Sequence, residues 1–314
     1  MISNNMMLLT KEGYNCLEDL AETTESYIYD SKTYDTKIEK QGRINMYSIN
    51  TSCVDELICD ANNRFLTKRF HPVTQNTWKP LLWITQEDYI AVPINKNNTF
   101  PKMKKHKKIF EDWFEDKKFW DFVGYILDNF EMNGNRIYIK NTRDSKYKLH
   151  ELKWDYKILK STNKIVITSP ALAYFLDFFS KEGHKFVLPN FVIDLPKNIL
   201  TILLRYILRD APSLNSEYQL YQHTDKKTIY YLATCVAKLY NTIYLINNNT
   251  VVNQRETFSL TYSKTIKSNS YGIYKDDILW YRVHSITQKP KMEVAYKIKN
   301  ALDRVVINGV LLSI

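Results

Sequence analysis

Phe122-Val-Gly-Tyr-Ile-Leu-Asp-Asn129 and Leu203-Leu-Arg-Tyr-Ile-Leu-Arg-Asp210 are two versions of one segment, with the shared core Tyr-Ile-Leu-x-Asn/Asp. Each version has the apolar spacing of a helix and ends on a polar side chain. Two such helices would bring the oxygens of Asn129 and Asp210 together, where they can hold a divalent cation. Close packing requires a small residue where two helices cross, and Gly124 meets that need whereas its counterpart Arg205 does not. Ordinary core packing of two helices explains the same pattern, so both interpretations stay open.

Length, charge and cysteine usage limit the class of protein. The chain has 314 residues, 44% of them hydrophobic, which is enough for a large core and for two domains. Its net charge of +10 favours a polyanionic partner. The cysteines form no Cys-x-x-Cys pair, so we expect no zinc site and a reduced intracellular setting. The chain shows neither a signal peptide nor a long uninterrupted apolar run, so we expect no membrane partner.

The pattern of predicted secondary structure changes twice along the chain. Residues 1–95 show short β-forming runs separated by turn residues, and such runs return from about residue 272. Between them, the sequence predicts helices at 119–129, 170–181, 197–209 and 227–241 and strands at 136–140, 164–168 and 217–222. The order helix, strands, helix therefore occurs twice. We predict an α+β protein in which an α+β segment is inserted into a β domain that both chain ends build.

The two opening segments resemble the paired dodecapeptide motif of LAGLIDADG homing endonucleases. Leu188-Pro-Asn-Phe191 resembles the lead-in to the second motif of that family. Four other stretches resemble successive blocks of the Hint, or intein, fold: Gly42–Ile49, Leu66–Val73, Asp88–Pro93 and Val305–Ile314. The chain is identified as a degenerate member of this family, of the yeast HO endonuclease and vacuolar-ATPase intein type.

The resemblance implies a domain organisation for the whole chain. A split, all-β Hint domain is expected at residues 1–97 and 269–314, with a LAGLIDADG domain inserted at residues 98–268. The inserted domain would contain pseudo-repeats at about 105–180 and 185–262, related by a pseudo-twofold axis within a monomer.

The resemblance also implies a metal-dependent cleavage site, which this sequence alters. Asn129 takes the place of the first catalytic carboxylate, Asp210 keeps the second, and Lys185 matches an active-site lysine, although a surface lysine fits it equally well. Since an amide oxygen brings no charge, Mg²⁺ should bind more weakly and cleavage should be impaired. Asp128 points about 100° away on an ideal helix, so it can substitute only if the helix end unwinds. The alternative is a competent endonuclease that uses Asp128 and Asp210.

Protein splicing is expected to be absent. Splicing in this family begins with an acyl shift at a first-position Cys or Ser and ends at a terminal Asn. Met1 stands at the first position, and Ser313 and Ile314 stand at the last two. His71 remains from its Hint block, but Lys68 replaces the Thr three residues earlier, which favours a structural role for His71.

Members of this family lay two sheets over the major groove of DNA, and the expected strands here carry alternating polar residues. The candidate DNA contacts are Arg136, Tyr138, Lys140, Gln219, Tyr221 and His223. Lys104 and Lys105 belong to the basic run Lys102–Lys108, which fits phosphate contacts, a solvated linker or a nuclear-import signal. We expect a nuclear protein that binds specific double-stranded DNA. The alternative from another class is a decayed element or interaction protein without a DNA role.

Overall fold

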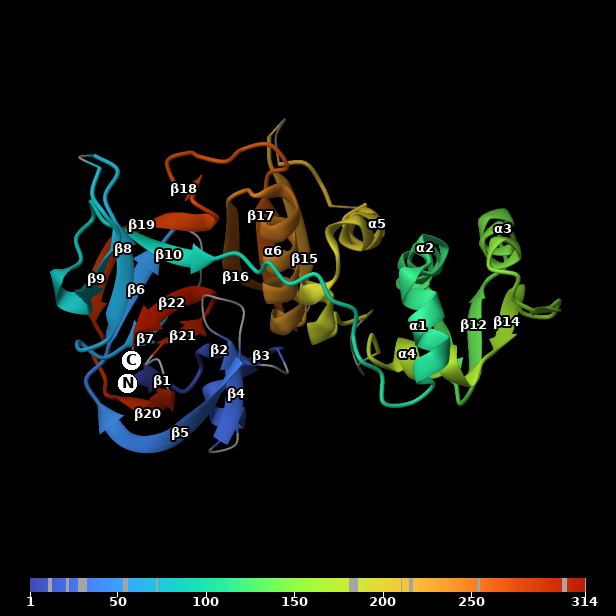
Figure 1. Ribbon diagram of the computed structural model, residues 1–314, viewed down its shortest axis with the longest axis horizontal. Helices are drawn as coiled ribbons and strands as arrows, with labels where there is room; N and C mark the ends of the chain where they lie inside the picture. Colours follow the sequence, from blue (N-terminus) through green and yellow to red (C-terminus); the bar gives the residue numbers. More distant parts are fainter. Residues whose placement is uncertain are drawn as a thin grey trace. The chain divides into compact units, whose positions relative to one another are not determined.

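The computed structural model describes residues 1–10, 13–20, 23–27, 33–52, 56–71, 73–180, 186–209, 211–214, 217–252, 255–300 and 304–313. The chain forms two compact units (Figure 1). Unit 1 joins Met1–Lys96 to Pro212–Ile314, and unit 2 is Asn97–Ala211. In the described ranges, no helix combines the length and the apolar character needed to cross a membrane.

Most of unit 1 is a large curled antiparallel sheet, to which both ends of the chain contribute. Its hydrogen-bonded order is β10-β19-β6-β7-β1-β20-β5-β4-β2-β21-β22-β8-β9, with β3 on β2 and β18 on β19. A pairing of β10 with β8 closes this path on itself. The strands are β1 (Ile2–Ser3), β2 (Met7–Thr10), β3 (Gly13–Cys16), β4 (Thr23–Tyr27), β5 (Thr33–Ile44), β6 (Tyr47–Thr51), β7 (Leu57–Cys59), β8 (Arg64–Lys68), β9 (Thr77–Pro80), β10 (Tyr89–Pro93), β18 (Gly272–Lys275), β19 (Ile278–Gln288), β20 (Glu293–Asn300), β21 (Arg304–Ile307) and β22 (Val310–Ser313). The predicted β character of both chain ends is confirmed.

Unit 1 also contains a second sheet, with the order β15-β17-β16, and the helix α6 (Lys226–Tyr240). Its strands are β15 (Gln219–His223), β16 (Tyr244–Val252) and β17 (Arg255–Tyr262). α6 packs on this sheet and also on β3, where the Tyr14 backbone N–H donates to the Tyr231 hydroxyl at 3.2 Å. The rings of Tyr14 and Tyr230 lie 5.0 Å apart, and burial raises the pKa of Tyr14 to about 12. α6 therefore connects the second sheet to β3 of the large sheet.

Unit 2 contains a sheet with the order β11-β12-β14-β13. This sheet is called the first sheet below, because it precedes the second sheet, β15-β17-β16, along the chain. Its elements are α1 (Lys107–Glu115), α2 (Lys117–Ile126), β11 (Glu131–Asn133), β12 (Arg136–Lys140), α3 (Arg143–Glu151), β13 (Lys157–Leu159), β14 (Lys164–Thr168), α4 (Pro170–Asp177) and α5 (Lys197–Ile207). Short 3-10 turns occur at Leu17–Asp19, Leu81–Trp83 and Asn190–Asp194. An aromatic core joins α1, α2 and α4, with Phe110 and Trp120 each within 6 Å of the Phe175 ring centre.

The predicted elements of unit 2 are largely confirmed, with two differences. The spacing of the aromatic residues over Phe110–Trp120 predicts one helix, but the structure divides this run at Asp116. The Asp116 side chain accepts a hydrogen bond from the Lys118 backbone N–H at 2.8 Å and so caps α2. α3 was not predicted, because Ser145 and Leu149 are its buried residues and a helix with so little apolar surface lacks a readable stripe.

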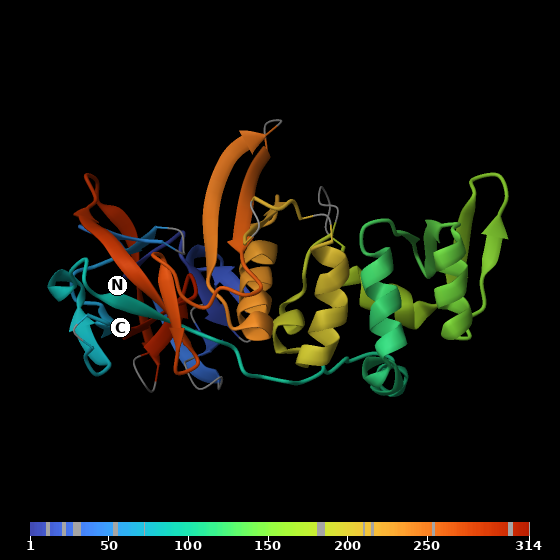
Figure 2. The same cartoon turned by 90° about the horizontal axis from the view of Figure 1, so that it is seen from above.

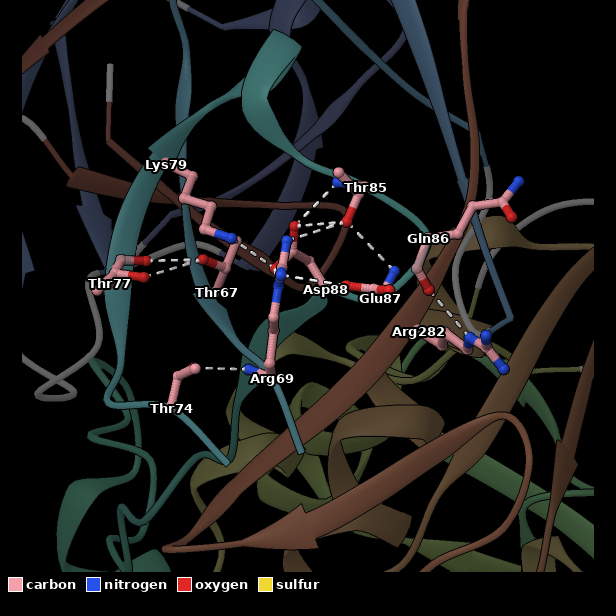
Figure 3. A network of polar contacts seen from close by, with 10 residues as sticks. All are labelled: Thr67, Arg69, Thr74, Thr77, Lys79, Thr85, Gln86, Glu87, Asp88 and Arg282. Atoms are coloured by element: carbon pink, nitrogen blue, oxygen red, sulfur yellow. Dashed lines mark hydrogen bonds and ion pairs between the residues drawn. The ribbon is translucent and has the colours of Figure 1, made fainter. Parts of the chain in front are cut away.

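A buried carboxylate ties three parts of the large sheet together (Figure 3). Asp88, which is fully buried, lies directly before β10. One of its carboxylate oxygens accepts hydrogen bonds from Arg69 Nε at 2.9 Å and Lys79 Nζ at 2.6 Å. The other accepts from the Thr85 backbone N–H at 2.9 Å. Burial alone would raise the pKa of Asp88, but the hydrogen bonds from Arg69, Lys79 and Thr85 outweigh it and lower that pKa.

We predict that Asp88→Asn lowers the free energy of unfolding by roughly 2–3 kcal/mol at neutral pH, because charge-assisted hydrogen bonds are lost. A carboxyl group whose pKa is lowered by folding stabilises the protein above its unfolded pKa. That stabilisation disappears as the pH falls through the folded pKa. Urea unfolding followed from neutral to acid pH should therefore show a weaker acid dependence in the variant.

Asp276→Asn is the matched control. The Asp276 side chain is 61% exposed, so solvent screens its ion pair with Lys68 and the substitution should cost little stability. Equal destabilisation by the two substitutions would contradict the role given to Asp88.

Candidate functional site

The two helices that carry the repeated Tyr-Ile-Leu lie side by side in unit 2 (Figure 2). They approach most closely at Gly124 of α2, where a Cβ atom would lie 2.6 Å from Cδ2 of Tyr206 on α5. The rings of Tyr125 and Tyr206, the equivalent tyrosines of the two segments, meet edge to face with centres 6.3 Å apart. The predicted close packing at Gly124 is thus confirmed.

The residue that faces Gly124 is Tyr206, and the expectation that Arg205 occupies the crossing is wrong. The Arg205 side chain is 63% exposed. Its guanidinium lies over the Tyr206 ring, 5.0 Å from the ring centre, and pairs with Asp121 of α2. Successive residues on a helix point about 100° apart, so Arg205 turns outward when Tyr206 fills the crossing.

A polar cluster lies beside the crossing, called the Asp121 cluster below: Asp121, Tyr125, Lys148, Arg205 and Tyr206. Asp121 accepts from the Tyr206 hydroxyl at 2.8 Å and from Lys148 Nζ. Lys148 also donates to the Tyr206 hydroxyl at 2.9 Å, and its Nζ lies 5.4 Å from the centres of both tyrosine rings. Burial alone would lower the pKa of Lys148, but the hydrogen bonds to Asp121 and Tyr206 raise it. Lys148 therefore stays charged at neutral pH.

The ends of the two repeated helices carry the predicted metal ligands. α2 ends at Ile126, and Asn129 lies exposed in the turn that follows, with its backbone N–H bonded to the Ile126 carbonyl at 2.8 Å. Asp128 is half-buried beside it. Asp210 and Lys185 lie outside the described residues. Within the described ranges, no group of three or more His, Cys, Asp or Glu side chains is placed to hold a metal ion. Of the two predicted metal ligands, Asn129 is therefore the one whose position the structure describes.

The first sheet has one apolar and one basic face. Ile137, Ile139, Ile165 and Ile167 are buried, whereas Arg136, Tyr138 and Lys140 alternate with them on β12. The register pairs Lys140 with Lys164 and brings Lys157 of β13 opposite Val166, so these lysines share the outer face. Glu131 of β11 lies opposite Tyr138 on this outer face, and its carboxylate pairs with Lys164 Nζ at 2.6 Å. The predicted alternation of buried and outward residues along β12 is confirmed.

The facing predicted for β15 in the second sheet needs correction. Gln219 and Tyr221 pair with Tyr262 and Leu260 of β17, which are fully buried. His223 on the same face is 9% exposed, and its Nδ1 accepts from the Asp225 backbone N–H at 2.9 Å. The face of Gln219, Tyr221 and His223 therefore carries the large buried side chains of this sheet, whereas on the opposite face of β15 Gln222 is exposed and Leu220 is half-buried.

The basic run Lys102–Lys108 forms a folded corner rather than one extended segment. Lys104 and Lys105 are exposed, and Lys105 Nζ lies over the Tyr174 ring at 5.7 Å. His106 takes a left-handed conformation with φ of 55°, and α1 begins at Lys107. Exposed lysines at such a corner can contact phosphates, while Lys107 and Lys108 are held in a helix.

The positions that resemble a splicing centre carry ordinary structural contacts. The Met1 ammonium pairs with Asp60 at 2.9 Å. His71 is exposed in a turn, Ser313 ends β22, and Ile314 lies outside the described residues. Lys68 is buried with its Nζ 5.5 Å from the Phe70 ring and 5.6 Å from the Trp280 ring. Lys68 thus stabilises an aromatic cluster through cation–π contacts.

Comparison with known proteins gives weak similarities. No family model and no curated protein matches the chain. Solved structures similar to it include an Ssp DnaB mini-intein variant, with a TM-score of 0.36 and 10% identity over 99% of this chain and 96% of that one. I-DmoI in complex with DNA and Mn has a TM-score of 0.32 and 10% identity over 47% of this chain and 89% of that one. The N-terminal LAGLIDADG domain of WhiA has a TM-score of 0.27 and 12% identity over 53% of this chain and 87% of that one. Scores this low carry no inference about function.

We predict that Gly124→Ala destabilises the protein, because the new methyl group meets the base of the Tyr206 ring. Overpacking costs roughly 1–3 kcal/mol, and the better helix propensity of Ala offsets about 1 kcal/mol of it. Thermal unfolding should show a lower Tm, and the loss should shrink when Tyr206→Ala removes the ring.

Gly42→Ala is the matched control, since a Cβ at Gly42 meets nothing within 4 Å. A Gly124→Ala variant at least as stable as the native chain would contradict the close crossing.

Proposed function

We propose that this chain is an intein-derived LAGLIDADG protein that binds specific double-stranded DNA through its first and second sheets. In this proposal the LAGLIDADG-like part is residues 98–268, inserted between Hint-like parts at 1–97 and 269–314. The protein is a nuclear monomer that does not splice and whose metal-dependent cleavage is impaired.

The observation that carries the proposal is internal repetition of topology. Each repeated helix is followed by two chain segments that pair, a helix, and two further strands. The first copy has the sheet order β11-β12-β14-β13. In the second copy, Ser213 forms a bridge with Gln219 of β15, which extends the order to Ser213-β15-β17-β16. α3 and α6 occupy equivalent places, each connecting the second segment to the third. Two copies of one folding unit support a DNA-binding role for each of the two sheets.

Electrostatics supports the first sheet as a DNA-binding face. Arg136, Lys140, Lys157 and Lys164 share its outer face with the single carboxylate of Glu131 among the side chains described there. Cations placed in rows over a sheet neutralise phosphates and release counterions, which is the main source of affinity for DNA. The outward Tyr138 between two cations suits contact with sugar or base edges.

Impaired cleavage follows from Asn129, which brings a neutral oxygen to the first ligand position. The competent-endonuclease alternative requires Asp128 to replace it, and Asp128 is half-buried in the turn after α2. A decayed element or an interaction protein without a DNA role predicts no salt-dependent binding to duplex DNA.

We predict that Arg136→Ala and Lys140→Ala each weaken binding to duplex DNA and that their combination lowers the salt slope of log Kobs by roughly 2. Each substitution removes one phosphate contact. Fluorescence anisotropy across a range of salt concentrations measures both quantities.

Lys117→Ala, which removes an exposed lysine at the start of α2, should change neither quantity. Absence of any duplex binding by the native chain at low salt would overturn the proposed function in favour of the alternative without a DNA role.

We predict that Asn129→Asp raises Mg²⁺-dependent cleavage of a randomised duplex library by on the order of tenfold, which about 1.4 kcal/mol of added charge stabilisation supplies. Sequencing of the cut ends measures the yield and the site preference. Asp128→Asn is the matched control and should leave cleavage unchanged. Efficient site-specific cutting by the native chain that Asp128→Asn abolishes would establish the competent-endonuclease alternative instead.

A further inference from the structure

We propose that Lys148, held by Asp121 and Tyr206, is a positioning residue. It fixes the orientation of α3 and, through α3, the orientation of the basic face of the first sheet that binds DNA. The inference rests on the proposed function, which it deepens by naming the side chains that fix the orientation of the sheet. Lys148 does not itself contact DNA in this proposal.

Lys148 links three helices of unit 2 through one ammonium group. It comes from α3, while Asp121 comes from α2 and Tyr206 from α5. The Lys148 side chain is 14% exposed and the Asp121 side chain 24% exposed, so solvent screens their attraction only in part. The rings of Tyr125 and Tyr206 enclose the ammonium at 5.4 Å each and add a cation–π attraction.

α3 depends on such polar contacts because it has little else to hold it. Its nine residues bury Ser145 and Leu149, and a helix of this length is not stable alone. Apolar packing through Leu149 keeps α3 against the core, but one side chain does not fix the rotation of a helix about that point. Lys148, next to Leu149, supplies a second and directional attachment.

The other end of α3 is bonded to the DNA-facing strand. Thr142 caps α3, accepting from the Ser145 backbone N–H at 3.0 Å, and its hydroxyl lies 2.7 Å from that of Tyr125. Ser145 Oγ donates to the Lys140 carbonyl at 2.7 Å. Lys140 is the last residue of β12 and lies on the basic face. Lys148 and Ser145 are one helical turn apart on α3, and Ser145 is hydrogen-bonded to the Lys140 carbonyl. A rotation of α3 caused by losing the Lys148 contacts would therefore also move Lys140.

Removing the negative charge of Asp121 distinguishes a positioning role of Lys148 from direct contact between Lys148 and DNA. If Lys148 bound a phosphate, removing the neighbouring Asp121 charge would strengthen binding to DNA. If Lys148 positions the sheet, removing the Asp121 charge breaks its attachment and weakens binding. The two roles thus predict opposite signs for one substitution.

The test is a double-mutant cycle on the full chain, with Asp121→Asn, Lys148→Met and their combination. Each single variant should weaken duplex binding roughly three- to tenfold. The double variant should bind duplex DNA at least as tightly as the single variant with the lower affinity, because both substitutions break the same attachment. Lys148→Arg should retain most of the affinity, because a guanidinium can still pair with Asp121. Binding is measured by anisotropy at temperatures where circular dichroism shows each variant folded.

Tyr206→Phe is a second route if Lys148→Met does not fold. It removes the hydroxyl that bonds both Lys148 and Asp121 but keeps the ring against Gly124, and it should also weaken DNA binding. Lys146→Met, on the same helix outside the Asp121 cluster, is the matched control and should bind as the native chain does.

Two results would overturn the inference while leaving the proposed function intact. One is tighter binding by Asp121→Asn, and the other is a lowered Tm in every cluster variant with unchanged affinity for DNA. Absence of duplex binding by the native chain would instead overturn the proposed function itself, so the two failures are distinguishable.

Discussion

The close approach of α2 to α5 at Gly124 is the constraint on which unit 2 depends. Without a Cβ at this position, the Tyr206 ring packs directly on the α2 backbone, and any larger residue would separate the helices. Helices this close must turn their long side chains away from the contact. Arg205 consequently points outward, and Asp121, three residues before Gly124, lies within reach of it. The Asp121 cluster is thus a consequence of the crossing.

Alternation and helical spacing predicted the elements whose residues separate cleanly into apolar and polar faces. β12 and β14 match their predicted ranges because isoleucine occupies every second position along both, between polar residues on β12 and between Lys164, Val166 and Thr168 on β14. α3 escaped prediction because charged residues dominate it. On β15 the alternation of residues was visible in the sequence, but the sequence did not show which of the two alternating sets faces the core. Tyr and Gln occur on both buried and exposed faces of sheets. The buried Leu260 and Tyr262 opposite β15 determine the direction, and they lie far along the chain.

The candidate site was predictable only in its local parts. Gly124 signalled a close crossing because a small residue inside an apolar helix has few other uses. The pairing of Asp121 with Lys148 has no such signal, since the two residues occupy different helices and neither stands in a motif. Tyr206 was visible as a repeated residue, but its role as the partner of Gly124 depends on the rotation of α5, which a single sequence does not determine.

Packing and chemistry are separable in this protein, and the two repeated helices show why. The crossing at Gly124 and the tyrosine pair lie inside the helices, where a substitution costs packing energy. Asn129 lies exposed beyond the end of α2, where replacing a carboxylate by an amide removes no buried contact. The second sheet is held in the same way by interior contacts, through α6 and the buried tyrosines against β3. A fold stabilised by such interior contacts keeps the first and second sheets in place whichever polar side chain stands at the exposed position 129 beyond α2.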